Sequence, residues 1–158
     1  MDIFLQVLVN GIIAGSVMAL IALGLSLIYG VLKFMNFAHG EMAMLGAFFY
    51  YHFYMVLLWP IIPSVIVSVG LCGLVGYLFN KLIFEKLKQE SMWTLLITSI
   101  GVSIFVKSTV LLVATGKGRN YAREDFESLT YSFLDGEILI TNYQVLILII
   151  TFFIFIAL

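Results

Sequence analysis

An apolar stretch without a single charged residue, from Ile3 to Ile28, constrains this chain more than any other feature of its sequence. An α-helix needs about 20 apolar residues to cross about 30 Å of hydrocarbon, and this stretch is too long for the apolar region of a signal peptide. The rest of the chain is similar, with 63% hydrophobic and 11% charged residues and a mean hydropathy of +1.13. The sequence therefore predicts an all-α fold, a polytopic membrane helix bundle.

The 158 residues have room for about five transmembrane helices of this length. The predicted spans are Ile3–Ile28, Met42–Trp59, Ile61–Phe79, Met92–Thr115 and a last one that begins near Leu139–Tyr143 and runs to the end of the chain. Pro60 and Pro63 are predicted to interrupt the helix between the second and third spans. Asn80–Ser91 and Gly116–Asn142 are predicted to be polar loops.

The two polar loops carry three basic residues each, so counting positive charges alone does not orient the chain. The lysines of the shorter loop lie close to its membrane ends, whereas the longer loop also holds five acidic residues. We therefore predict that Asn80–Ser91 is cytoplasmic and that Gly116–Thr141 lies outside.

Small residues recur at helical spacing in two of the predicted spans. Gly11 and Gly15 form a GxxxG step in the first, and Gly70, Gly73 and Gly76 form a stripe along the third. Close backbone approach at small residues is what brings helices together in lipid. These glycines are predicted to be helix-packing residues of a compact bundle, which says nothing by itself about function.

The stretch VLKFMNFAHGEMAML, residues 31–45, places polar side chains between apolar segments of membrane-spanning length. An ionisable group at membrane depth costs about 2.5 to 3.5 kcal/mol on insertion scales, so it is usually buried against protein or lines a watery cavity. Two interpretations are open. The stretch is either an interfacial loop, or a helix break or re-entrant turn near residues 33–41, in which Gly40 relieves the backbone and Asn36, His39 and Glu41 face a passage.

Several ordered segments resemble the N-terminal part of branched-chain amino-acid (LIV-type) ABC transporter permeases. They are the run NGIIAGSVMALIALGLSLIYGV from Asn10 to Val31, the hexapeptide NFAHGE from Asn36 to Glu41, MLGAF from Met44 to Phe48, and LLITSIGVSIFV from Leu95 to Val106. Together they cover most of the chain. A chance match between apolar sequences would not reproduce the polar hexapeptide and the placement of the serines and glycines.

The resemblance implies a multi-pass permease subunit of an ABC importer in the cytoplasmic (inner) membrane. With a second permease subunit it would form a passage for leucine, isoleucine and valine or related small amides. Cytoplasmic ABC ATPase subunits would drive transport, and an extracytoplasmic substrate-binding protein would deliver the substrate. No enzymatic activity and no cofactor are then expected in this chain. The external segment Gly116–Glu137 is either a docking surface for the binding protein or a solvated loop.

On this interpretation Asn36, His39 and Glu41 lie beside the substrate pathway, and Phe37 contacts the aliphatic part of the substrate. Family members are about twice as long, and the cytoplasmic loop that seats the ATPase follows the fifth span. Residues 1–158 are therefore predicted to be the N-terminal part of a transmembrane permease domain. Two other functions stay open: a packing or regulatory membrane fragment without transport of its own, and an intramembrane enzyme that uses His39 and Glu41 as an acid–base pair.

The remaining reactive side chains give no sign of a further site. The histidines have no ligand set at metal-binding spacing, and the single cysteine, Cys72, is predicted to be a packing residue. A net charge of -1 and the lack of a basic run exclude nucleic acid and leave membrane lipid as a partner. Lys107, inside the fourth span, either extends its ammonium group to the headgroups or pairs with Glu41.

Overall fold

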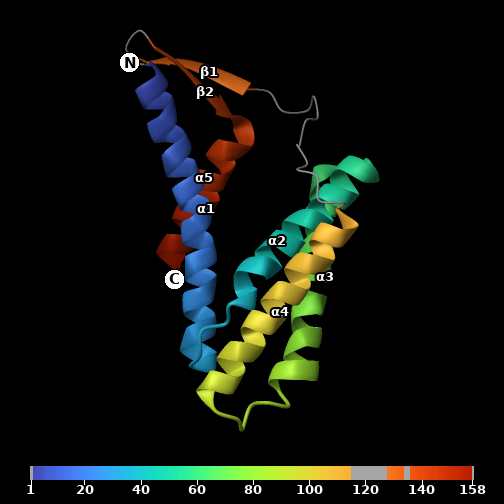
Figure 1. Cartoon of the computed structure of the whole chain (residues 1–158). Helices are drawn as coiled ribbons and strands as arrows, with labels where there is room; N and C mark the ends of the chain where they lie inside the picture. The colour runs from blue at the N-terminus through green and yellow to red at the C-terminus, as the bar shows by residue number, and fades with distance from the viewer. Residues whose placement is uncertain (1, 115–127, 134–135, 158) are drawn as a thin grey trace. The chain divides into compact units, whose positions relative to one another are not determined.

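The computed structural model describes residues 2–114, 128–133 and 136–157. Helices account for most of them, and the predicted helical membrane bundle is confirmed (Figure 1). In chain order the elements are α1 (Asp2–Leu32), α2 (Ala38–Tyr51), the π-helical turn η1 (His52–Val56), α3 (Ile61–Phe79), the π-helical turn η2 (Asn80–Phe84), α4 (Met92–Val113), β1 (Ser128–Phe133), β2 (Gly136–Thr141) and α5 (Asn142–Ala157).

Three helical segments of the described chain are long and apolar enough to cross a membrane: Ile3–Leu32, Ile61–Phe84 and Met92–Val113. The second and fifth predicted spans also form helices, but these are shorter. The α-helical part of α2 has 14 residues and continues into η1, and α5 has 16 residues. At 1.5 Å per residue, α2 alone rises only about 21 Å, less than the hydrocarbon thickness.

The two prolines at the start of α3 have different roles, and the prediction that both interrupt the helix is wrong for Pro63. Leu58 has a positive φ of 55° and Pro60 is extended, with φ −61° and ψ 156°, so the chain turns before the helix. Pro63 lies in the first turn of α3. The first backbone N–H groups of a helix have no partner within it, so a proline there removes no hydrogen bond.

The third span extends beyond its predicted end. Asn80–Phe84 was predicted to begin a polar loop, but it continues the helix as η2, closed by a hydrogen bond of 2.8 Å from the Glu85 N–H to the Asn80 carbonyl. Phe84 is buried in the core, and its apolar ring explains why the helix does not stop at Asn80.

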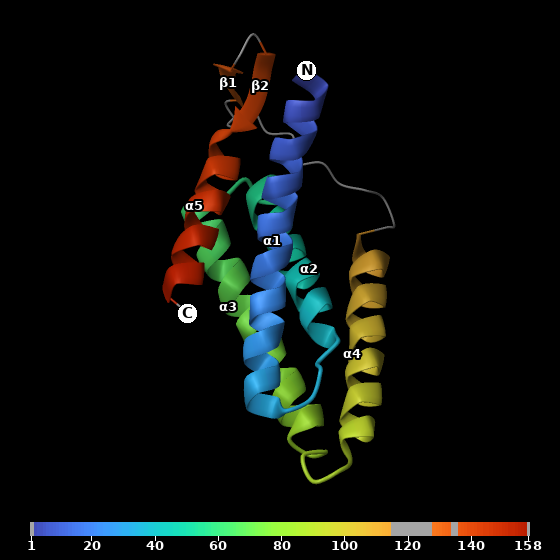
Figure 2. The same cartoon turned by 90° about the vertical axis from the view of Figure 1, so that its left-hand side faces the viewer.

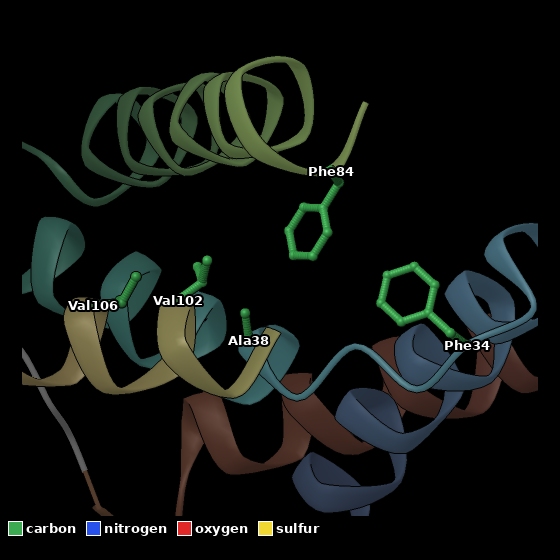
Figure 3. Close-up of a cluster of buried hydrophobic side chains, with 5 residues drawn as sticks. All are labelled: Phe34, Ala38, Phe84, Val102 and Val106. Carbon is green, nitrogen blue, oxygen red and sulfur yellow. The ribbon is translucent and has the colours of Figure 1, made fainter. Parts of the chain in front are cut away.

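Residues Gly24–Tyr121 form one compact unit. Within it α2 lies between α3 and α4 and contacts both (Figures 1 and 2). Five buried residues form its core: Phe34, Ala38, Phe84, Val102 and Val106. Figure 3 shows the Phe34 and Phe84 rings pointing toward one another, and their centroids are 5.8 Å apart. The chain between α1 and α2 is thus part of the core.

The other unit combines the start of α1, up to Leu23, with the C-terminal part of the chain. Its strands pair antiparallel, from Ser128 opposite Thr141 to Phe133 opposite Gly136, and α5 follows β2 directly. This hairpin was not expected, because Gly116–Asn142 was predicted to be a loop. Alternating apolar residues in SLTYSF were the available signal. The other residues of that predicted loop, 116–127 and 134–135, lie outside the described part.

Candidate functional site

The predicted helix break is present and covers residues 33–37, between α1 and α2. Lys33, not Gly40, gives the backbone its turn: its φ is 59°, and its N–H donates to the Tyr29 carbonyl at 2.9 Å. This is the αL helix end, in which one residue with positive φ closes the last turn. Gly40 lies inside α2, so the expectation that it relieves the backbone is wrong.

Asn36 lies just before the second helix, which begins at Ala38. Its side-chain oxygen accepts a hydrogen bond of 3.1 Å from the Ala38 N–H, and its carbonyl accepts one of 3.1 Å from the His39 N–H. The first N–H groups of a helix need such acceptors, and asparagine is among the best residues for this role. Asn36, which was predicted to face a passage, therefore also accepts hydrogen bonds from the first residues of α2.

A buried serine of α4, which no sequence pattern singled out, holds the middle of the break. Ser99 is 0% exposed, and its hydroxyl oxygen accepts a hydrogen bond of 3.2 Å from the Phe37 N–H. The hydroxyl proton can go to the Leu96 carbonyl at 2.8 Å or to the Met35 carbonyl at 3.4 Å. Residues about 60 positions apart in the sequence are joined here, so no local pattern could have shown the contact.

A groove of about 790 Å³ lies beside the break, within the unit of residues 24–121. Its walls come from the end of α1, from α2, from α3 with η2 and from Val102 of α4, and they are mostly apolar. The polar side chains among its lining residues are Asn36, His39, Tyr50, Ser68 and Asn80, and the sulfur-containing ones are Met42 and Cys72. Ligand sites typically have this make-up, an apolar concavity of about 300–1,000 Å³ with a few polar groups.

Of the four predicted pathway residues, the groove brings together Asn36 and His39 but not Phe37 and Glu41. The Phe37 side chain is 48% exposed, and Glu41 is half-buried in the first turn of α2. Residues i and i+2 of a helix do not face each other, which explains why His39 lines the groove and Glu41 does not.

The imidazole of His39 is half-buried and lines the groove. No hydrogen bond joins it to another residue in the part of the chain that the structure describes. Its ring lies against the backbone of α1 at Gly24, where a Cβ would be 2.6 Å from Nε2. Nε2 is therefore covered by α1 in this position, and neither ring nitrogen has a hydrogen-bond partner among the described residues.

Two further glycines mark where α2 and α3 come close. The Cys72 thiol donates to the Met42 carbonyl at 3.2 Å, and a Cβ on Gly46 would be 3.5 Å from the Cys72 Sγ atom. A Cβ on Gly76 would be 3.6 Å from the Met42 methyl group. Cys72 is thus half-buried at this contact and also lines the groove.

The other predicted packing glycines have open space around them. A Cβ on Gly11, Gly15, Gly70 or Gly73 would meet no described atom within 4 Å, leaving aside the helix's own backbone. Their role in helix packing stays a prediction, because no described residue packs against them.

Lys107, in the middle of α4, is exposed. The described residues contain no ion pair between it and Glu41, so the proposed pairing of these two charges receives no support. The long stem of a lysine can carry its ammonium group toward the headgroups, as the other interpretation requires.

Known transport proteins match almost the whole chain. The family model described as "Branched-chain amino acid transport system / permease component" matches residues 7–158. The permease protein BraD of the high-affinity branched-chain amino acid transport system of Pseudomonas aeruginosa is 31% identical over 162 residues, which cover 94% of this chain and 52% of BraD. The LivH permease proteins of Escherichia coli K12 and Salmonella typhimurium are each 32% identical over 117 residues, 69% of this chain and 38% of LivH. The chain spans about half the length of the curated relatives it matches. No solved structure matches it.

Proposed function

The chain belongs to the family of branched-chain amino acid transport permeases, and on that premise we propose that it forms part of the passage of an ABC importer. The substrates are leucine, isoleucine and valine or related small amides. Its apolar helices and its family place it in the cytoplasmic (inner) membrane as a multi-pass protein, as the sequence predicted. Its partners in this proposal are a second permease subunit, cytoplasmic ABC ATPase subunits and an extracytoplasmic substrate-binding protein.

The groove beside the helix break is the observation that carries this proposal. A branched-chain amino acid is a zwitterion with an apolar side chain, and both parts must leave water on the way through a membrane. The groove offers apolar walls for the substrate's side chain, and Asn36 and His39 line it beside the helix break. These polar groups would offset part of the cost of desolvating the ammonium and carboxylate groups.

The two predicted pathway residues outside the groove keep a separate role in the proposal. Phe37 is half exposed beside the break, and Glu41 lies in the first turn of α2. We assign them to the passage on a neighbouring surface, with Phe37 against the aliphatic part of the substrate. Their effects on transport are therefore expected to be independent of groove binding.

An intramembrane enzyme built on His39 and Glu41 has weaker support. General acid–base catalysis by a pair requires both groups within reach of one substrate, but residues two apart on a helix point to different sides. The groove contains His39 without Glu41. A membrane fragment that only packs or regulates would not need unpaired ring nitrogens in an apolar groove.

The test is leucine uptake by membranes that hold the whole transporter, measured beside the abundance of each subunit. His39→Ala and Glu41→Gln are expected to reduce uptake several-fold while the ATPase and the binding protein still assemble. His52→Ala is the matched control, because His52 is exposed and does not line the groove. Normal uptake at normal abundance for both pathway variants would make the break a connecting turn and contradict the proposal.

A further inference from the structure

We propose that Gly24 is a positioning residue that fixes the imidazole of His39 in the groove. This inference deepens the proposed transport function and rests on it for its biological meaning, but the contact itself can be tested separately. The resemblance to known permeases places Gly24 within a long matching run without giving it a role, and the small-residue stripes predicted from sequence do not include it.

The geometry is specific to one edge of the ring. A Cβ built on Gly24 would lie 2.6 Å from Nε2, 2.9 Å from Cε1 and 3.9 Å from Cδ2 of His39. Non-bonded carbon atoms are normally about 3.5–4.0 Å apart, so the first two distances leave no room for a methyl group. The Nε2–Cε1 edge therefore lies directly against the backbone of α1.

Glycine is an unfavourable choice at this position unless the contact requires it. Gly24 lies inside α1, where alanine is the better helix former. The other glycines of the helix, Gly11, Gly15 and Gly30, have open space where a Cβ would lie. Gly24 is thus the one glycine of α1 at which a described neighbour excludes a side chain.

A side chain at position 24 has a defined consequence. His39 lies in the first turn of α2, its backbone is held by the hydrogen bond to Asn36, and its side chain turns about two torsions. Because His39 also lines the groove, a methyl group on residue 24 would drive the ring away from α1 and into that space. The substitution would leave the histidine in place but change where its nitrogens point.

Chemical modification of the histidine measures this position without relying on transport. Membranes that hold the whole transporter are treated with diethyl pyrocarbonate, and peptide mass spectrometry gives the ratio of modified His39 to modified His52. His52 is an exposed internal standard in the same chain. Gly24→Ala is expected to raise the ratio several-fold, because Nε2 loses the cover of α1. Gly30→Ala, on the same helix in open space, is expected to leave it unchanged.

Abundance gives a second readout if the alanine variant assembles poorly. Removing the imidazole makes room for the new methyl group, so Gly24→Ala combined with His39→Ala is expected to recover the abundance of His39→Ala alone. An unchanged modification ratio in a normally abundant Gly24→Ala variant overturns the inference. So does a double variant as depleted as Gly24→Ala. A raised ratio with normal leucine uptake supports the position of the ring and instead contradicts the role of His39 in the passage.

Discussion

The hydrogen bond between Ser99 and the helix break gives the sharpest prediction for stability. Replacing Ser99 with alanine removes the oxygen that accepts the Phe37 N–H, in a position that is 0% exposed. The described structure offers that N–H no second acceptor. The Leu96 carbonyl lies inside α4, so it accepts a hydrogen bond of the helix backbone as well as the one from the Ser99 hydroxyl. Removing the hydroxyl therefore does not leave this carbonyl unpaired.

The expected cost follows from the donor that is left unpaired. A polar group without a partner costs about 1–3 kcal/mol when it is fully buried, and the part-buried Phe37 N–H belongs in the lower half of that range. Alanine is a better helix former than serine by at most about 0.7 kcal/mol, which offsets part of that loss. The net decrease in the free energy of unfolding is therefore about 1 kcal/mol, a factor of about 5 in the ratio of folded to unfolded protein.

Ser64→Ala is the matched control. Ser64 is also 0% exposed, but its hydroxyl donates only to the Pro60 carbonyl of its own helix turn, at 2.8 Å. The same atom is lost in both variants, so the cavity terms cancel, and only Ser99→Ala leaves a backbone donor unpaired. Unfolding of the purified chain from detergent by increasing sodium dodecyl sulfate, followed by far-ultraviolet circular dichroism, measures both. Equal midpoints for the two variants would refute the role of Ser99 in holding the break.

Two further predictions concern orientation and assembly. In a cysteine-free background, a cysteine at Lys86 is expected to react with a membrane-impermeant thiol reagent only after the cytoplasmic side is opened. A cysteine at Asp125, which lies outside the described residues, is expected to react in intact cells, and the opposite pattern would reverse the orientation. If a partner helix packs on the α3 stripe, Gly73→Leu is expected to lower the yield of the assembled transporter, measured after membrane extraction. Unchanged assembly and transport would show that the α3 stripe does not pack against a partner.

The existence of the break could be predicted from sequence, but the residues that build it could not. Asn36, His39 and Glu41 interrupt an apolar sequence. Placing such side chains in lipid costs free energy, and this cost indicated a break in the helix near these residues. The turn itself depends on a positive φ at Lys33, which is uncommon for a residue with a side chain, whereas Gly40 offered an obvious but unused alternative. Local propensity therefore identified the region and selected the wrong residue.

The composition of the groove depends on information that a linear pattern does not contain. Which of the polar residues share a face follows from the helical phase of α2, and that phase is fixed by its start at Ala38. The contacts of His39 with Gly24 and of Phe37 with Ser99 each join two helices. A serine or glycine inside an apolar helix permits such a contact, but the sequence does not say which one makes it. Ser64 and Ser99 are equally buried and have different partners.

Gly73 shows how two predictions for one surface can be separated. It lies in the small-residue stripe predicted to seat a neighbouring helix, and it also lines the groove proposed as part of the passage. A helix packed closely on Gly73 would fill the space that a substrate needs, so both roles cannot hold at this residue. The Cβ of a leucine there meets no described atom within 4 Å, and the side chain extends from a position that lines the groove. Gly73→Leu should therefore reduce assembly if a helix occupies the groove, and reduce uptake at normal assembly if substrate does.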